Sequence, residues 1–410
     1  MNKDSAQPHP PDSSPSVLRL PPSVFRLPSL IPRWVWTDVV LPMVVVRLCL
    51  LLVGWFSQIL LPNPRYPVPE ALARGWHYSQ SRLLDIWARW DSGWYFGIIR
   101  RGYALDENIQ STMSDIAFFP LYPYLIKLFV FLLPERMQTT ERLLIIGLLI
   151  SNVLLIAALV LLHKLVTSLF DRETAQRTIL YTLLFPTGFF LFCFYTESTF
   201  LFLSVAAFYA AQRRAWGAAC LCGALLALTR PPGILISVPL FWMYLESIEW
   251  KPARLRPNVL YFLLIPAALL SFFLYAQRLT GDFLAPVHAQ QAWNKRFAMP
   301  WTTLFNPYGG DPYVTSVEQV LTVAFIALAV LALFKLSSPA YAIYSFLLII
   351  PPLLSGTLIS TSRYYLVVFP AFILLARFGK HPLLDNLIKI TLFTLQLLFM
   401  LAWARFYWVA

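Results

Sequence analysis

Charged side chains are scarce in this 410-residue sequence. Asp, Glu, Lys and Arg make up 13% of the residues, whereas apolar residues reach 58% and the mean hydropathy is +0.64. Soluble proteins carry about 25% charged residues, because a surface in contact with water needs them. The composition therefore excludes an ordinary soluble protein and predicts an all-α integral membrane protein.

Cysteine and histidine are also rare, with four and five residues. The cysteines all lie within apolar sequence: Cys49, Cys193, Cys220 and Cys222. The Cys220/Cys222 spacing lacks the second pair that a zinc site needs, and neither His77 nor His288 has a partner at ligand spacing. We therefore expect neither a metal site nor another cofactor.

Acidic residues are outnumbered by basic ones, which gives a formal net charge of +12. The basic residues are scattered between apolar runs and form no continuous stripe, so nucleic-acid binding is not expected. A basic, proline-rich segment, 1–36, is too polar to span a bilayer and is predicted to be a disordered cytoplasmic tail. Residues 37–410 then form one multi-span domain.

Apolar runs predict about eleven spanning helices, some of them shorter than the roughly 20 residues that a span needs. They lie near 38–61, 142–163, 177–190, 198–212, 216–229, 233–247, 258–277, 317–335, 338–358, 364–378 and 386–408. Basic residues favour the cytoplasmic side of a membrane. Most basic loops fall on that side if the segment 118–133 lies in the outer membrane interface and does not cross the bilayer. The loops 62–141 and 278–316 are then external.

A tryptophan-rich stretch at 82–95 follows the first span and carries Asp85, Arg89 and Asp91. On a helix, Asp85 and Arg89 are one turn apart and can pair, which leaves Asp91 on a different face and free for a ligand. Two other roles for Asp91 stay open, namely a helix cap and an interfacial ion pair.

Four short motifs follow one another along the predicted external segments: Arg89-Trp90-Asp91-Ser92 with Tyr95, Phe118-Phe119-Pro120, Tyr195-Thr196-Glu197-Ser198 and Leu228-Thr229-Arg230-Pro231. Together they resemble the PIG-V family, the GPI mannosyltransferase 2 group with its bacterial relatives. The resemblance implies a C-type glycosyltransferase that moves mannose from a polyprenyl-phosphate carrier to a glycolipid or glycan acceptor. It also implies that the catalytic residue is an aspartate of the first external loop, which corresponds to Asp91.

The chemistry of such a transfer needs a base for the acceptor hydroxyl and cations for the leaving phosphate. Arg230 and Arg363 are candidates for the phosphate, although arginines at span ends also snorkel to the interface. Arg47 lies inside the first span, and Glu197 is a possible partner for it. The expected substrate-binding residues are Arg89, Trp90, Tyr95, Glu197, Arg230, Trp293, Arg363 and Tyr364.

The short loops are typical of a bacterial member, so we expect a plasma-membrane protein with its site facing outside. Trp293 lies in the 278–316 loop, where aromatic residues either stack on sugars or form an interfacial belt. A flippase for lipid-linked sugars is the main alternative function, although no internal repeat is evident. A catalytically inactive scaffold is a further alternative.

Overall fold

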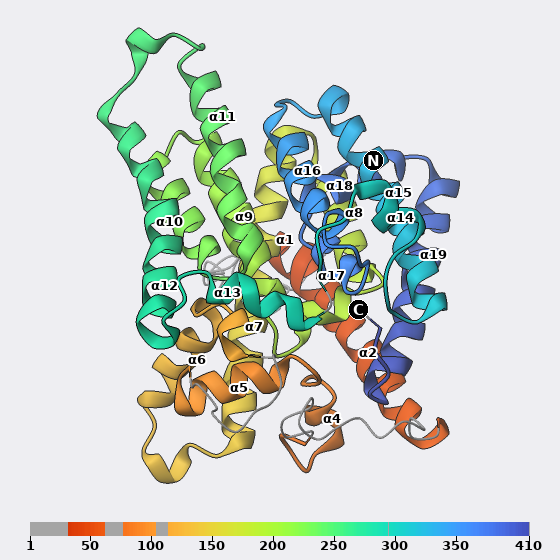
Figure 1. Cartoon of the computed structure of the whole chain (residues 1–410). Coiled ribbons are helices and arrows are strands. Elements are labelled where there is room, and N and C mark those ends of the chain that lie inside the picture. Colours follow the sequence, from red (N-terminus) through yellow and green to blue (C-terminus); the bar gives the residue numbers. More distant parts are fainter. Residues whose placement is uncertain (1–31, 62–76, 104–113, 294, 410) are drawn as a thin grey trace, which may run out of the picture.

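The computed structural model describes residues 32–61, 77–103, 114–293 and 295–409, and within these ranges it is helical and contains no strand (Figure 1). This confirms the predicted all-α class. The α-helices are α1 (Arg33–Val35), α2 (Leu41–Leu60), α4 (Arg82–Asp85), α5 (Ser92–Arg101), α6 (Leu121–Phe131), α7 (Thr140–Leu169), α8 (Arg172–Leu184), α9 (Glu197–Gln212), α10 (Trp216–Ala227), α11 (Ser237–Ser247), α12 (Leu264–Thr280), α13 (Ala285–His288), α14 (Pro300–Phe305), α15 (Pro312–Lys335), α16 (Ala340–Leu353), α17 (Thr361–Tyr365), α18 (Phe369–Phe378) and α19 (Pro382–Ala404).

Short 3-10 segments and one π-helical segment connect or extend these helices. They are η1 (Trp36–Val40, π-helical), η2 (Asp115–Ala117), η3 (Glu135–Met137), η4 (Gly188–Phe192), η5 (Pro231–Ile236), η6 (Pro252–Arg254), η7 (Pro257–Leu263) and η8 (Ala289–Trp293). Residues 1–31 of the expected tail lie outside the described residues, and helix α1 begins at Arg33, before the expected boundary at 37.

Five helical stretches among the described residues are long and apolar enough to cross a membrane. They are Arg33–Leu60, Thr140–Leu169, Pro257–Thr280, Pro312–Lys335 and Pro382–Ala404. Apolar side chains on them, such as Leu52, Val153 and Leu387, stay exposed, as expected of surfaces that face lipid. The chain is therefore a multi-pass membrane protein. The number of eleven spans stays a prediction, because the remaining apolar helices are shorter.

Helix α9 occupies the centre of the bundle and is buried on almost every side. Its small residues Ala207 and Ala211 allow close helix contacts, while Phe208 packs against Tyr341 and Tyr344 at ring distances of 5.1 and 5.2 Å. Its first residue is Glu197, so the polar start of α9 is held inside the protein by the packing of the rest of the helix.

Helices α4, α5 and α6 gather at the lower end of the bundle in Figure 1, opposite the connection between α11 and α12. Helix α6 has 11 residues and is only about 16 Å long at 1.5 Å per residue, which is too short to span. Gly147 of α7 faces Phe194, because a Cβ atom there would come within 2.0 Å of the Phe194 ring. Phe194 also joins the segment before α9 to the 82–95 stretch, because its N–H donates to Trp87 O at 2.9 Å and its carbonyl accepts from Ser92 Oγ at 3.2 Å.

Candidate active site

The tryptophan-rich stretch folds into a tight turn between α4 and α5. The Arg89 guanidinium donates from Nη1 to Asp85 Oδ2 at 2.8 Å, which confirms the predicted pairing one turn apart. Trp90 has a φ of +49°, a left-handed conformation that is strained for a bulky residue. This conformation turns the backbone between the Asp85–Arg89 pair and Asp91.

Asp91 occupies the N-cap position of α5, but its side chain accepts no hydrogen bond from that helix. Instead, Asp91 Oδ2 accepts from Arg363 Nη1 at 2.9 Å. The Tyr195 hydroxyl fixes the backbone below it, because it donates to Arg89 O at 2.8 Å and accepts from Asp91 N at 3.1 Å. The carboxylate is therefore aimed away from its own helix, toward α17.

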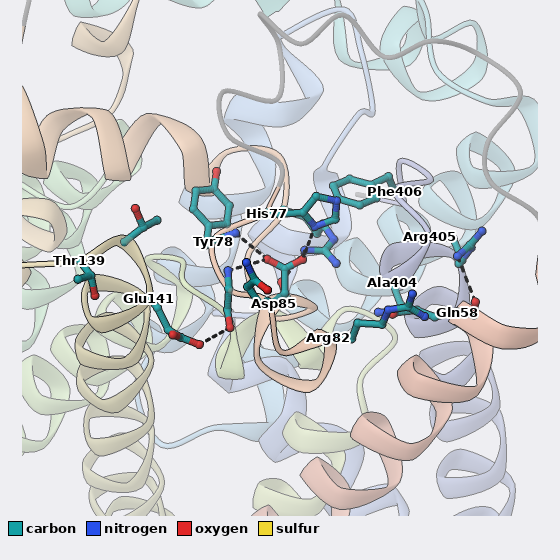
Figure 2. Close-up of a pocket in the computed structure, with 14 residues that line it drawn as sticks. Gln58, His77, Tyr78, Arg82, Asp85, Thr139, Glu141, Ala404, Arg405 and Phe406 are labelled. Carbon is teal, nitrogen blue, oxygen red and sulfur yellow. Dashed lines mark hydrogen bonds and ion pairs between the residues drawn. The ribbon is translucent and has the colours of Figure 1, made fainter.

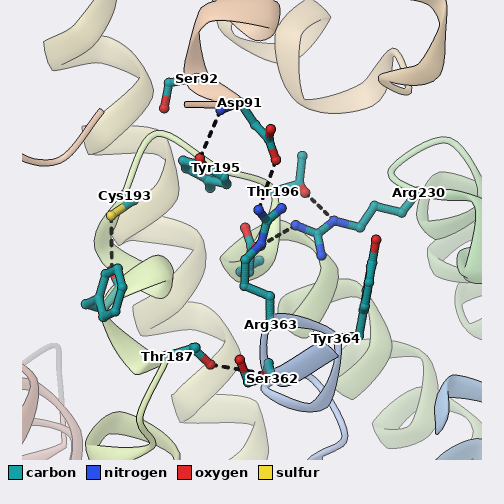
Figure 3. A network of polar contacts seen from close by, with 12 residues as sticks. Asp91, Ser92, Thr187, Cys193, Tyr195, Thr196, Arg230, Ser362, Arg363 and Tyr364 are labelled. Atoms are coloured by element: carbon teal, nitrogen blue, oxygen red, sulfur yellow. Dashed lines mark hydrogen bonds and ion pairs between the residues drawn. The ribbon is translucent and has the colours of Figure 1, made fainter. Parts of the chain in front are cut away.

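Arg363 joins Asp91 to a second carboxylate, that of Glu197. Figure 3 shows the side chains of Asp91, Arg230 and Arg363 close together. Its Nε donates to Glu197 Oε1 at 2.9 Å, and the same oxygen accepts from Arg230 Nη2. Arg230 Nε also donates to Thr196 Oγ1 at 2.6 Å. Residues from the starts of α5, α9, η5 and α17 thus form one connected network, which we call the Asp91 network: Asp91, Thr196, Glu197, Arg230 and Arg363.

The Asp91 network is almost closed to water. The Glu197 side chain is 0% exposed, those of Arg363 and Arg230 are 8% and 9% exposed, and Asp91 is the most open at 14%. Two carboxylates balance two guanidinium groups, which makes burial of the charges tolerable. Glu197 Oε2 and Arg230 Nη1 are nevertheless buried without a hydrogen-bond partner among the described residues. Such atoms can serve a ligand.

Glu318 holds the segment that carries Arg363. Its side chain lies in α15 and is 1% exposed, and its two oxygens accept from Ser362 N at 2.6 Å and Ser362 Oγ at 2.7 Å. Thr187 Oγ1 donates to Ser362 O at 3.1 Å. Sequence reasoning missed Glu318, although a carboxylate inside the apolar run 317–335 was a signal for it.

Lys295 is a third cation near this network, and sequence reasoning missed it as well. Its Nζ donates to Tyr364 Oη at 3.1 Å and to Gln290 Oε1 at 2.9 Å. Arg230 lies 5.9 Å and Lys295 Nζ 5.6 Å from the centre of the Tyr364 ring, so Tyr364 contacts two cations. The only sequence signal for Lys295 was its position two residues after Trp293 in an external loop.

The predicted aromatic residues surround the network at different depths. Tyr95 is buried and its ring lies 6.3 Å from that of Tyr195. The ring centres of Trp293 and Phe118 lie 5.7 Å apart, so the segment that carries Trp293 reaches the segment before α6. Trp90 packs on Trp408 at 5.1 Å, and its Nε1 is buried without a partner among the described residues.

One predicted contact differs from the structure. Arg47 donates to Asn152 Oδ1 and lies 4.9 Å from the Trp87 ring, so its partner is not Glu197. Glu197 instead pairs with Arg363 and Arg230, which reach it from other segments of the chain. Arg89 pairs with Asp85 and lies 4.1 Å from the centre of the Phe406 ring, outside the Asp91 network, and its role in substrate binding stays a prediction.

The described part of the chain contains no cluster of three or more His, Cys, Asp or Glu side chains suited to a metal. His288 Nδ1 instead lies 2.7 Å from Asp282 Oδ2, and this hydrogen bond lowers the pKa of Asp282.

The fold and this network define a multi-pass membrane protein with a buried site of paired carboxylates and arginines. The mannosyltransferase (PIG-V) family matches residues 42–294, well over half of the chain, and the chain belongs to this family. This is the family that its motifs indicated.

Among solved structures, the crystal structure of ArnT from Cupriavidus metallidurans bound to undecaprenyl phosphate is similar, with a TM-score of 0.49 and 14% identity. The match covers 84% of this chain and 60% of that one, so the chain spans less than two thirds of the length of ArnT. No curated protein matches the chain at a significant level.

Proposed function

We propose that this protein transfers mannose from a polyprenyl-phosphate carrier to a glycolipid or glycan acceptor, with inversion at the sugar carbon and with Asp91 as the general base. The observation that carries this proposal is the way Asp91 is held. Arg363 fixes Oδ2, whereas Oδ1 takes no hydrogen bond from any described residue. An oriented carboxylate with one open oxygen is suited to accept a proton.

The reaction is a single displacement. Asp91 Oδ1 accepts the proton of the acceptor hydroxyl while the acceptor oxygen forms a bond to the anomeric carbon of mannose. The bond between that carbon and the phosphate oxygen breaks, and the electron pair leaves with the polyprenyl phosphate. Because attack and departure take place on opposite faces of the sugar, the configuration inverts.

The leaving phosphate gains negative charge, which fixed cations stabilise best. In this proposal Arg230 supplies its unpartnered Nη1, and Lys295 supplies an ammonium that is held at the Tyr364 hydroxyl. Arg363 is already divided between Asp91 and Glu197, so we assign it to positioning the base instead of gripping phosphate. Tyr95, Trp90 and Trp293 form the apolar surroundings of the sugar.

Arginine and lysine would take the place of a divalent cation at the phosphate, so the proposed reaction is independent of metal. The loops 62–141 and 278–316 of the domain 37–410 would carry base and substrate contacts on the outer face of a bacterial plasma membrane. A transfer assay in the presence of a chelator checks the first point, and complete loss restored by added manganese would contradict it.

The decisive test is transfer of labelled mannose from polyprenyl-phosphate mannose by purified protein in lipid. We expect Asp91→Asn to lower kcat by about 10²–10⁴-fold, the usual range for loss of a general base. Asp311→Asn is the matched control, because Asp311 is an exposed helix cap and asparagine caps as well. Undiminished transfer by Asp91→Asn would remove the proposed base, whereas lipid flipping without transfer would favour a flippase.

A further inference from the structure

Two bulky residues have left-handed backbone conformations at the place where the turn before α5 meets the segment that follows α19. Trp90 has a φ of +49° and Phe406 has a φ of +62°. Such conformations are strained for bulky residues, persist only where the surrounding structure imposes them, and cluster at functional sites. The Arg89 guanidinium lies 4.1 Å from the centre of the Phe406 ring. The ring centres of Trp90 and Trp408 lie 5.1 Å apart, so the two strained turns are in contact.

The chain turns back at the end of α19 through a helix-capping motif. The Tyr407 N–H donates to Ala402 O and the Phe406 N–H donates to Trp403 O, both at 3.0 Å. The left-handed residue of such a motif is usually glycine. Here it is a phenylalanine whose ring lies beside His77 (Figure 2). The reversal brings the residues that follow onto the turn before α5.

The last turn of α19 and the segment that follows it dock on this turn through several side chains. Trp403 is 1% exposed, and its Nε1 donates to Ile86 O at 2.8 Å. The Trp408 ring meets the Trp90 ring nearly at right angles, with an angle of 77° between the planes. Val409 is buried as well. The segment after α19 is therefore packed onto the turn that leads to α5.

Tyr195 holds the backbone of Trp90, whereas Trp408 packs on its ring. The Tyr195 hydroxyl donates to Arg89 O at 2.8 Å and accepts from Asp91 N at 3.1 Å. These two groups belong to the peptide bonds immediately before and after Trp90. A single hydroxyl thus fixes both peptide groups of the strained residue, and Trp408 fixes its indole.

We propose that Trp408 and the Tyr195 hydroxyl are positioning groups that together keep Trp90 in its left-handed conformation. This conformation aims the next side chain, the Asp91 carboxylate, at Arg363, whose Nη1 lies 2.9 Å away. If Trp90 relaxed to a negative φ, the carboxylate would leave this position. The inference rests on the proposed function, in which Asp91 is the general base.

Mannose transfer is the first test of this proposal. We expect Trp408→Ala and Tyr195→Phe each to lower kcat about tenfold, because a displacement of about 1 Å is costly for a catalytic group. KM should change less, since the substrate contacts remain. Trp408→Phe keeps a ring against Trp90 and should restore most of the activity. Tyr195→Phe removes one hydroxyl and keeps the ring beside Arg363, so it tests the proposal even if Trp408→Ala fails to fold.

Trp250→Ala is the matched control. Trp250 and Trp242 form the same kind of pair, with ring centres 4.8 Å apart and an angle of 78° between the planes. Trp250 lies in the connection between α11 and α12, at the opposite end of the bundle from α5 in Figure 1. Loss of this pair should leave kcat at the wild-type value.

A double-mutant cycle separates positioning of the base from general support of the fold. Trp408→Ala is combined with Asp91→Asn, a variant that has no base left to position. We expect the double variant to have the kcat of Asp91→Asn alone. A role in general stability would instead lower kcat by the same factor with and without the Asp91 carboxylate, and this result would overturn the proposal.

Hydrogen–deuterium exchange of the peptide 86–92 reports on the turn itself, without catalysis. We expect Trp408→Ala and Tyr195→Phe to speed its exchange and Trp250→Ala to leave it unchanged. Wild-type exchange in both of the first two variants would overturn the proposal, and Asp91 would remain the base as long as Asp91→Asn is inactive. If Asp91→Asn transfers mannose undiminished while Trp408→Ala speeds exchange, the proposed base is wrong and the holding of Trp90 by Trp408 stands.

Discussion

Asp85 and Asp91 lie six residues apart and both pair with an arginine, yet their surroundings differ. Asp85 accepts from the backbone of Tyr78 and Ser79 through Oδ1, and from Arg89 and His77 through Oδ2. Its side chain is 3% exposed. The Asp91 carboxylate has one hydrogen-bond partner, Arg363, so its second oxygen is open, and the side chain is 14% exposed.

This difference indicates a structural role for the Asp85 carboxylate and a reactive role for the Asp91 carboxylate. A carboxylate whose oxygens are all occupied stabilises the turn but has nothing left for a substrate. A carboxylate held by one oxygen is oriented and still able to react. The buried, unpartnered Glu197 Oε2 and Arg230 Nη1 place the rest of the Asp91 network in the second group. Hydrogen-bond saturation thus distinguishes the Asp85 carboxylate from the Asp91 carboxylate more clearly than burial does.

The largest expected effect on stability comes from Asp85→Asn. The substitution leaves the Arg89 guanidinium buried without its counter-charge, and breaking a buried ion pair in this way costs about 3–5 kcal/mol. We expect the melting temperature in detergent to fall sharply, with mannose transfer per folded molecule largely kept.

Asp91→Asn is the counterpart for that measurement. Arg363 keeps its bond to Glu197 in this variant, so we expect a smaller loss in the free energy of unfolding than the loss caused by Asp85→Asn. If Asp91→Asn lowered the melting temperature as much as Asp85→Asn, the proposed difference between a structural Asp85 and a reactive Asp91 would be wrong.

Much of this contrast could be predicted from sequence, because it depends on local spacing and membrane side. The four-residue separation predicted the Asp85–Arg89 pair. The charge bias of the loops put Asp91, Glu197, Arg230 and Arg363 on one side, and the structure brings these four side chains together.

The remaining contacts depend on distant segments whose packing no local pattern reveals. Glu318 and Ser362 are 44 residues apart, and Lys295 and Tyr364 are 69 apart. The partner of Arg47 was predicted wrongly for the same reason, because several polar groups in the bundle lie within reach of a side chain in the first span. Helix lengths could not be predicted either, because the 3-10 segment η4 (Gly188–Phe192) is as apolar as a helix and leaves no break in hydropathy.

Glu318 offers an intermediate case, because it is a saturated carboxylate that acts on the network through Ser362. Glu318→Ala leaves the Ser362 N–H and hydroxyl unpartnered, at about 1–3 kcal/mol for each buried group. Arg363 then loses its fixed position, and we expect kcat to fall about tenfold in the mannose-transfer assay, with a smaller change in KM.

Glu318→Gln tests whether position, rather than charge, is what matters. Its amide oxygen can accept from Ser362 N and its amide nitrogen can donate to Ser362 Oγ, so most of the activity should return. Glu246→Ala is the control, because Glu246 likewise accepts from a serine, Ser338, and from Trp242. If Glu246→Ala lowered kcat as much as Glu318→Ala does, general destabilisation would explain both losses.

Substitution of Asp171 has the smallest expected effect on stability. It tests whether a carboxylate that is fully hydrogen-bonded but exposed stabilises the fold. The Lys380 ammonium, 2.8 Å away, and the Thr174 N–H lower the pKa of Asp171 to about 2. Because the folded pKa is depressed, the stabilisation is complete above the unfolded value near 3.8 and disappears as the pH falls toward 2. The side chain is 43% exposed, so solvent screening limits the contribution to less than about 1 kcal/mol.

Asp171→Asn isolates the charge, since asparagine still caps α8. We expect its melting temperature to lie slightly below that of the wild type at pH 7, with the gap closing between pH 4 and pH 2. Lys380→Met should show the same gap at pH 7. If Asp171→Asn lowered the melting temperature as much as Asp85→Asn does, hydrogen bonding would matter more than burial. The stabilising role of Asp85 would then come from its hydrogen bonds and not from its burial.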